Sequence, residues 1–170
     1  MVFNFQGLYV KELGGSTALI GAASSMAALS EMPIMFISGW LALHLGGKRM
    51  VIMALVMYVL RALSLSLMPS ADWIVPVQLL HGPSFGIFMM ATVNLVYEMA
   101  GPELAATAQG LLASAVSFGI IIGALVGGVI IDNFGFVTVF RLAAFMAFLA
   151  LLVFVLGSRR WSRPDALARP

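Results

Sequence analysis

Residues 105–131 read AATAQGLLASAVSFGIIIGALVGGVII, a long apolar run that contains no charged side chain. A helix of about 20 apolar residues is long enough to cross the hydrocarbon core of a bilayer. A strand that crosses a membrane is about ten residues long and alternates in polarity, which this run does not. The run therefore predicts a transmembrane helix.

Other stretches of the same kind stand on either side of it. They run from about Thr17 to His44, Met50 to Met68, Trp73 to Tyr97 and Phe136 to Leu156. Short connections rich in glycine, proline and charge separate them, namely Leu45–Arg49, Pro69–Asp72, Ala100–Glu103 and Asp132–Gly135. Short connections make consecutive helices antiparallel neighbours. We therefore expect an all-α transmembrane fold, an antiparallel bundle of five spans.

The composition of the whole chain agrees with a membrane protein. Hydrophobic residues make up 62% of the 170 residues and charged residues 9%, against about 45–50% and about 25% in soluble domains. The chain has no cysteine, which excludes disulfides and zinc–thiolate sites. It has no P-loop and no HExxH motif, and its basic residues form no stripe for nucleic acid. We expect a lipid-embedded protein that is not an enzyme, with no cofactor, no metal and no nucleic-acid partner.

The basic residues are unevenly divided between the two predicted sides of the membrane. Because cytoplasmic loops are enriched in Lys and Arg, the richer side should be cytoplasmic. This places a cytoplasmic tail at residues 158–170 and a multi-pass protein in the plasma (inner) membrane. Met1–Val10, an apolar segment interrupted by Asn4, Gln6 and Gly7, is expected to be the stump of a helix whose earlier part is missing or lies in another chain. The richer side holds Lys48, Arg49, Arg159, Arg160, Arg163 and Arg169, and the other side holds Lys11, with Arg141 a little inside it.

Three ionisable residues, Glu31, Arg61 and His81, fall well inside predicted spans. A charged side chain at the bilayer centre costs roughly 2.5–3.5 kcal/mol on insertion scales. Such residues must face a partner or water, and helix tilt with a long side chain would let Arg61 reach Glu31. Two interpretations stay open: the charges lock helices together, or they form a proton or substrate site in a wet cavity.

Gln78, His81 and Ser84 recur at a spacing of three and predict one polar stripe on the third span. Asn94 and Glu98 continue this polar edge toward the cytoplasmic end. The stripe favours a cavity wall, and the alternative is hydrogen bonding between helices, worth about 0.6 kcal/mol on average.

Gly119, Gly123 and Gly127 follow one another at intervals of four in the fourth span. Glycines at this spacing form a groove that another helix backbone can approach closely. We interpret them as helix-packing residues. Arg141 is interpreted as structural: it either snorkels outward or pairs with Asp132.

The stretch from Ser30-Glu31-Met32-Pro33 to Gly110 resembles the lactose permease-like branch of the major facilitator superfamily. Within it, residues 39–49 are similar to the superfamily's loop motif, with Leu43 in place of its acidic residue. The matching positions are Gly39, Gly46, Gly47, Lys48 and Arg49.

The same resemblance extends to the charged residues. In that family a glutamate binds sugar and contacts a histidine, and an arginine aids proton release. The resemblance implies that Glu31 and His81 are substrate-site residues and that Arg61 serves coupling. Ser84 occupies the position of the family's proton-carrying carboxylate, so the proton carrier must differ here. The stretch 82–86 looks instead like the broader permease-like group that includes nucleoside:proton symporters.

The resemblance implies that residues 1–157 are the carboxy-terminal half of a secondary active transporter. Substrate would lie between this half and a separate amino-terminal half, near the middle of the membrane. The expected cargo is a small polar solute such as a sugar or nucleoside, moved with protons by alternating access. The alternative is a non-transporting remnant or a helix-packing partner.

Overall fold

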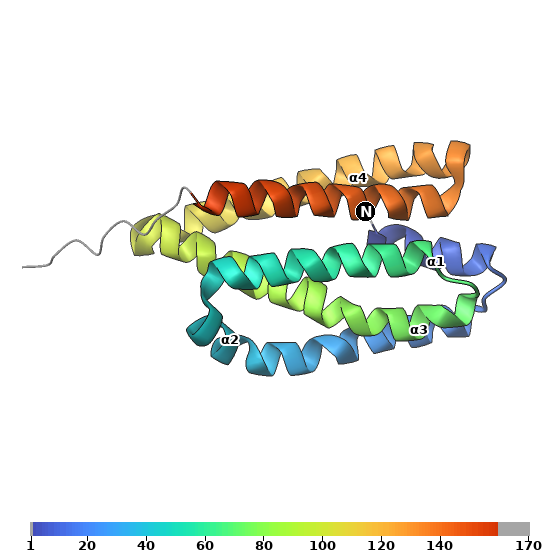
Figure 1. Ribbon diagram of the computed structural model, residues 1–170, viewed down its shortest axis with the longest axis horizontal. Helices are drawn as coiled ribbons and strands as arrows, with labels where there is room; N and C mark the ends of the chain where they lie inside the picture. The colour runs from blue at the N-terminus through green and yellow to red at the C-terminus, as the bar shows by residue number, and fades with distance from the viewer. Residues whose placement is uncertain (1, 160–170) are drawn as a thin grey trace, which may run out of the picture.

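The computed structural model describes residues 2–159, with side chains placed for residues 5–158. Within this range every regular element is helical (Figure 1), which confirms the predicted all-α class. The α-helices are α1 (Val2–Glu12), α2 (Thr17–Ser66), α3 (Ile74–Val77) and α4 (Ile87–Arg159). Between α2 and α4 lie the 3₁₀ turns η1 (Ala71–Trp73) and η2 (Gln78–Leu80) and the π-helical turn η3 (Gly82–Gly86).

The long helices α2 and α4 double back on themselves at single glycines. Gly46, Gly101 and Gly135 have φ values of 72°, 71° and 77°, a conformation that only glycine adopts at low cost. Figure 1 shows the chain reversing at each of these points, so that the segments lie antiparallel. The segments are residues 17–45, 47–66, 87–100, 102–134 and 136–159.

The predicted connections are therefore correct in position but wrong in length at three of four places. Four- or five-residue loops were expected at 45–49, 100–103 and 132–135, and one glycine leaves the helical conformation in each. At the fourth place the helix does stop, because Leu67 caps the end of α2 before the turn into η1.

Two apolar clusters hold the bundle together, one toward each end. The first joins Tyr9 on α1 to Leu65, Ile74 and Phe140. In it the Tyr9 ring lies 5.1 Å from that of Phe140 and 5.6 Å from that of Phe136. The second cluster is built from residues of both α2 segments and the start of α4, among them Leu41, Met50, Ala54, Ile87 and Leu95. Along each of these segments the polar residues described below come between the two clusters.

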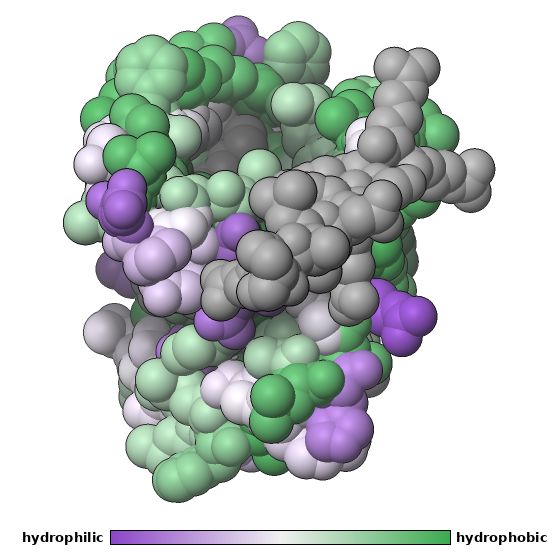
Figure 2. Space-filling model, turned by 90° about the vertical axis from the view of Figure 1, so that its left-hand side faces the viewer, coloured by the Kyte–Doolittle hydropathy of each residue, from purple (hydrophilic) through white to green (hydrophobic). Residues whose placement is uncertain are grey.

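The outer surface is largely apolar. Phe36 is 88% exposed, Leu43 87% and Val153 71%, and Figure 2 shows hydrophobic residues reaching the rim of one end, with hydrophilic ones between them. Thr17–Ser66 and Ala71–Ser158 are each long and apolar enough to cross a membrane. A surface of this kind suits lipid as its solvent.

The number of five crossings and the cytoplasmic position of the carboxy terminus stay predictions. Most of the predicted tail, including Arg160, Arg163 and Arg169, lies outside the described residues, as does Met1.

Candidate functional site

A carboxylate and an imidazole meet in the middle of the bundle. His81 Nε2 lies 2.8 Å from Glu31 Oε1, and their side chains are 8% and 29% exposed. Glu31 comes from residues 17–45 of α2, and His81 from the short connection between η2 and η3. Residues 50 positions apart in the chain thus form one hydrogen-bonded pair, with the carboxylate on its more open side.

Arg61 is buried beside this pair, with 2% of its surface exposed. Its Nη2 donates to Gln6 Oε1 at 3.1 Å and to Gln78 Oε1 at 3.0 Å. Among the placed side chains Arg61 forms no ion pair with Glu31, so the expected Glu31–Arg61 pairing is wrong. The physical reason is that His81 holds the Glu31 carboxylate, while two carboxamide oxygens lie within hydrogen-bonding distance of the guanidinium.

Gln6 is a member of this cluster that the sequence did not identify. Its polar side chain in Met1–Val10 read only as an interruption of an apolar segment. The Gln6 side chain is 7% exposed in the structure, and the signal in the sequence was an amide inside an otherwise apolar segment, because a buried amide must find a hydrogen-bond partner.

A close crossing of two helices brings Glu31 to His81. Ser30 Oγ accepts a hydrogen bond from the Gly82 backbone N–H at 2.9 Å and lies 3.2 Å from the Gln78 carbonyl oxygen. A Cβ atom on Gly82 would overlap the Ser30 carbonyl group. One turn along, a Cβ on Gly86 would lie 3.1 Å from Cγ2 of Ile34. Small residues on one helix therefore let the backbone of the other approach, as in membrane helix pairs generally.

The helix that carries His81 is irregular where the site forms. The predicted span Trp73–Tyr97 was expected to be one regular helix, and instead it passes through 3₁₀, α, 3₁₀ and π turns before α4 begins. Pro76 and Pro83 lie within these turns, and a proline removes a helical hydrogen bond and clashes with the preceding turn. Short 3₁₀ and π turns inside helices frequently mark functional sites.

The predicted stripe of Gln78, His81 and Ser84 is brought into one buried cluster. Gln78 and Ser84 are both 0% exposed. The Ser84 hydroxyl donates to the His81 carbonyl oxygen at 3.0 Å. The Phe85 ring stacks on the imidazole, with 5.3 Å between ring centroids and 13° between planes. Within this cluster, Glu31 and the Phe85 ring, whose exposed fractions are 29% and 37%, keep surface that can meet a solute.

The other predicted residues lie away from this cluster. Asn94 is half-buried further along α4. Four of the loop-motif residues lie at the bend of α2, where Gly46 makes the turn and Gly47 packs on Leu95. Arg49 is exposed there and Lys48 is half-buried, while Gly39 is exposed in the helix before the bend.

The packing role of the glycines in residues 102–134 stays a prediction. Gly119 is exposed with open space around it, Gly123 is half-buried and Gly127 is buried. Arg141 is exposed, and within the described range it forms no ion pair with Asp132.

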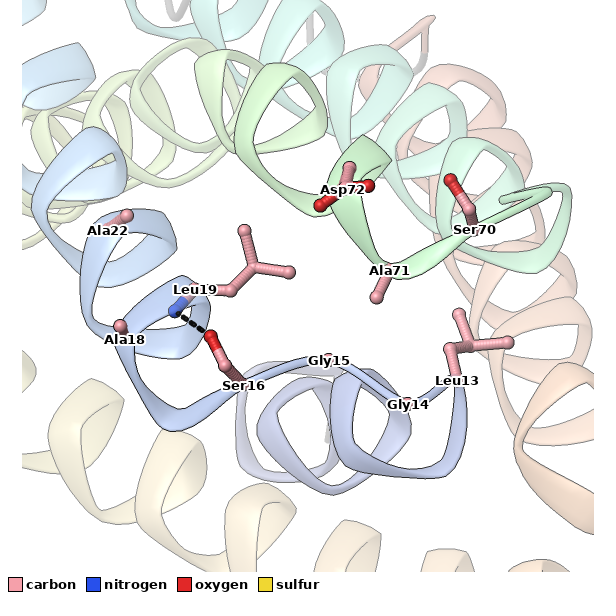
Figure 3. A pocket seen from close by; sticks show the side chains of 10 residues that line it. All are labelled: Leu13, Gly14, Gly15, Ser16, Ala18, Leu19, Ala22, Ser70, Ala71 and Asp72. Atoms are coloured by element: carbon pink, nitrogen blue, oxygen red, sulfur yellow. Dashed lines mark hydrogen bonds between the residues drawn. The ribbon is translucent and has the colours of Figure 1, made fainter.

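A pocket of about 520 Å³ lies elsewhere, at the turn from α1 into α2. Figure 3 shows the Leu19 side chain pointing into it, with Ser70 and Asp72 on another wall. Ser16 Oγ accepts from the Leu19 N–H at 3.1 Å and so caps α2. Asp72 is the only ionisable residue in its lining, and no residue of the Glu31–His81 cluster takes part. The pocket is therefore separate from the candidate site.

An all-helical, lipid-facing bundle with a charged cluster in its interior is the architecture of a membrane transporter. The family described as MFS_1 like family matches residues 1–142, so this chain belongs to that family, within the major facilitator superfamily.

Two curated relatives are similar to this chain. One is named "Multi-drug resistance efflux pump PmrA" from Streptococcus pneumoniae, 31% identical over 157 residues. The other is named "Multi-drug resistance efflux pump PmrA homolog" from Lactococcus lactis subsp. lactis, 29% identical over 157 residues. The matches cover 90% of this chain but 39% and 38% of these relatives. The chain thus spans about two fifths of their length. The lactose permease-like branch is not among these matches.

Proposed function

We propose that this chain forms one half of a proton-coupled secondary transporter, in which Glu31 and His81 bind the solute and carry the proton step. The observation that supports this most is the 2.8 Å contact between carboxylate and imidazole in the bundle interior. Ionisable residues inside membrane proteins are functional candidates by default.

The pair can couple proton and solute by competition. One oxygen of Glu31 contacts His81, and the carboxylate keeps 29% of its side-chain surface exposed for a donor group on the solute. A proton that binds to the pair removes negative charge from the carboxylate. Solute affinity then falls, so proton entry and solute release become linked. Ser84 is not needed as a proton carrier in this scheme.

The surroundings of Glu31 favour an amphipathic solute with a positive or donor group. Met32 and Met35 are each 55% exposed, and Phe85, stacked on His81, is 37% exposed. This surface agrees with the names of the relatives, and export of drug-like compounds is the solute class that we propose. A small polar solute such as a sugar or nucleoside is the second candidate, favoured by the polar stripe. It is the weaker one because Gln78 and Ser84 are fully buried.

In the proposed transporter the solute lies between Glu31–His81 and a second wall, which would come from another part of a longer transporter. Members of this superfamily hold substrate near the midplane between two halves, and this chain spans 39% of the first relative. We place the assembled protein in the plasma (inner) membrane, with residues 158–170 cytoplasmic. The alternative is a non-transporting remnant or a packing partner of other helices.

Transport in membrane vesicles tests the proposal. Vesicles carrying this chain, alone or with an upstream half, would be given a pH gradient and then ethidium or uridine. We expect gradient-dependent movement of ethidium, lowered about tenfold or more by Glu31→Gln. Glu103→Gln, an exposed carboxylate at the Gly101 bend, is the matched control and should leave transport unchanged. Equal transport in the Glu31→Gln variant would make the pair a helix lock, and no transport in any combination would support the remnant.

A further inference from the structure

Arg61 carries a positive charge into the interior, and among the placed side chains no carboxylate lies within ion-pair distance of it. The guanidinium is 2% exposed, and the hydrogen bonds that it makes go to the carboxamide oxygens of Gln6 and Gln78. The Glu31 carboxylate is in contact with His81 instead. A buried charge is costly unless an opposite charge and hydrogen bonds compensate it. Two neutral amides supply the hydrogen bonds but not the charge.

Around Arg61 and Gln78 there are more hydrogen-bond donors than acceptors. Within the described part of the chain, neither Arg61 Nε nor Gln78 Nε2 has a hydrogen-bond partner. Rotating the Gln78 amide would not help, because its NH₂ group would then face the guanidinium, which is itself only a donor. Leaving buried donors unsatisfied costs about 1–3 kcal/mol each. The two nitrogens belong to side chains that are joined by a 3.0 Å hydrogen bond between Arg61 Nη2 and Gln78 Oε1.

A cavity on the α1 side borders Gln6, one member of this cluster. It has a volume of about 150 Å³, and Gln6, Ser24 and Ile74 are among the residues that line it. A water molecule takes up about 30 Å³ in the liquid, so a small ion with part of its hydration shell fits. Gln6 both lines this cavity and accepts from Arg61, so the Gln6 side chain separates the cavity from the guanidinium, and neither Arg61 nor Gln78 is among the lining residues.

We propose that Arg61 and Gln78 form a binding site for one small anion, a halide ion or a carboxylate. A buried positive charge and N–H groups without acceptors select for negative charge and for an acceptor. The site is distinct from the Glu31–His81 pair, where the exposed group is a carboxylate. Because it is a matter of equilibrium binding, it does not depend on whether the chain transports a solute.

Chlorine-35 NMR on the purified chain, in micelles of an uncharged detergent, measures this binding. Bound chloride broadens the chloride signal, and we expect added acetate to reverse the broadening by competition. Arg61→Gln should weaken chloride binding by about tenfold or more, and Gln78→Leu should weaken it while keeping the charge. Arg141→Gln removes an exposed arginine and should change nothing.

Folding of each variant is checked by helix content and by elution volume. If Arg61→Gln fails to fold, Gln78→Leu and Arg61→Lys still decide the question, since Lys keeps the charge but loses the planar donor fork. If the chloride signal with the unmodified chain is no broader than in detergent alone, the proposal is overturned. Broadening that persists in the folded Gln78→Leu and Arg61→Lys variants, or that disappears in Arg141→Gln, would also overturn it.

Discussion

Residues 82–86 and residues 119–127 both carry glycines four positions apart, but the surroundings of Gly82 and Gly119 are opposite. A Cβ on Gly82 would overlap the Ser30 backbone, whereas one on Gly119 would meet nothing within 4 Å. Glycine spacing thus identifies a smooth helix face but not what covers it. At Gly82 the cover is a helix of this chain, fixed by a serine hydroxyl that bonds the glycine N–H.

The difference between these two stretches has a functional side. The close crossing at Gly82 sets the distance between Glu31 and His81, since Ser30 precedes Glu31 and His81 precedes Gly82. The open face at Gly119 takes no part in that site. It is available to lipid or to another part of a longer transporter. The sequence predicts that another helix packs on it.

The largest effect is expected from Gly82→Ala. The added methyl group meets a backbone carbonyl that cannot rotate away, so the two helices must separate. Overpacking of this kind costs about 3 kcal/mol, the upper end of the usual range. Unfolding in sodium dodecyl sulfate, followed by circular dichroism, measures the loss. A variant as stable as the unmodified chain would show that the helices do not cross here.

Ser30→Ala should come next. The change removes the hydroxyl that accepts from the Gly82 N–H, and we expect a loss of about 0.6–1.7 kcal/mol, from the average to the maximum measured for hydrogen bonds between helices of a membrane protein. Ser38→Ala is the matched control on the same helix, because the Ser38 hydroxyl donates only to the Met35 carbonyl one turn earlier. Equal losses in the two variants, in the same unfolding assay, would contradict the crossing contact.

Gly86→Ala tests the edge of the crossing. Its Cβ would lie 3.1 Å from Cγ2 of Ile34, a side-chain end that can give way by a few tenths of an ångström. The expected cost is below about 1 kcal/mol. A double-mutant cycle with Ile34→Ala should remove that cost, since the crowding atom is gone. A cost that persists in the Ile34→Ala background would place the strain elsewhere.

Gly119→Ala should have the smallest effect in this chain, within about 0.5 kcal/mol, as for exposed positions. The same change should lower stability once an upstream half is present and covers this face. Co-purification of the two halves, with and without the substitution, measures how far the substitution weakens their association. A large loss in the isolated chain would mean that Gly119 already packs against a helix.

The sequence was sufficient for the fold class and for part of the site. Long uncharged runs predict membrane helices, and a charge inside such a run, as at Glu31 or His81, is visible without a structure. The family resemblance implied a contact between Glu31 and His81, but the partners of Arg61 were not predictable, because depth along a helix says nothing about rotation around its axis. That rotation turns Arg61 toward Gln6 and Gln78 rather than Glu31.

Ser30 was missed for a related reason. Serines in membrane helices commonly bond their own preceding turn, as Ser24, Ser38 and Ser64 do here. Nothing in the local sequence distinguishes Ser30 from these, because the partner that matters, the Gly82 N–H, lies 52 residues away.

The most direct test asks whether Glu31 faces water at membrane depth. The chain has no cysteine, so single cysteines can be placed at Glu31 and at Met146, which is more exposed at 55% than the 29% of the Glu31 side chain. A charged, membrane-impermeant thiol reagent reacts with a thiolate, which requires contact with water. We predict rapid labelling of Glu31→Cys and slow labelling of Met146→Cys in membranes. Faster labelling at Met146 than at Glu31 would contradict a water-accessible site and leave the polar cluster a structural lock.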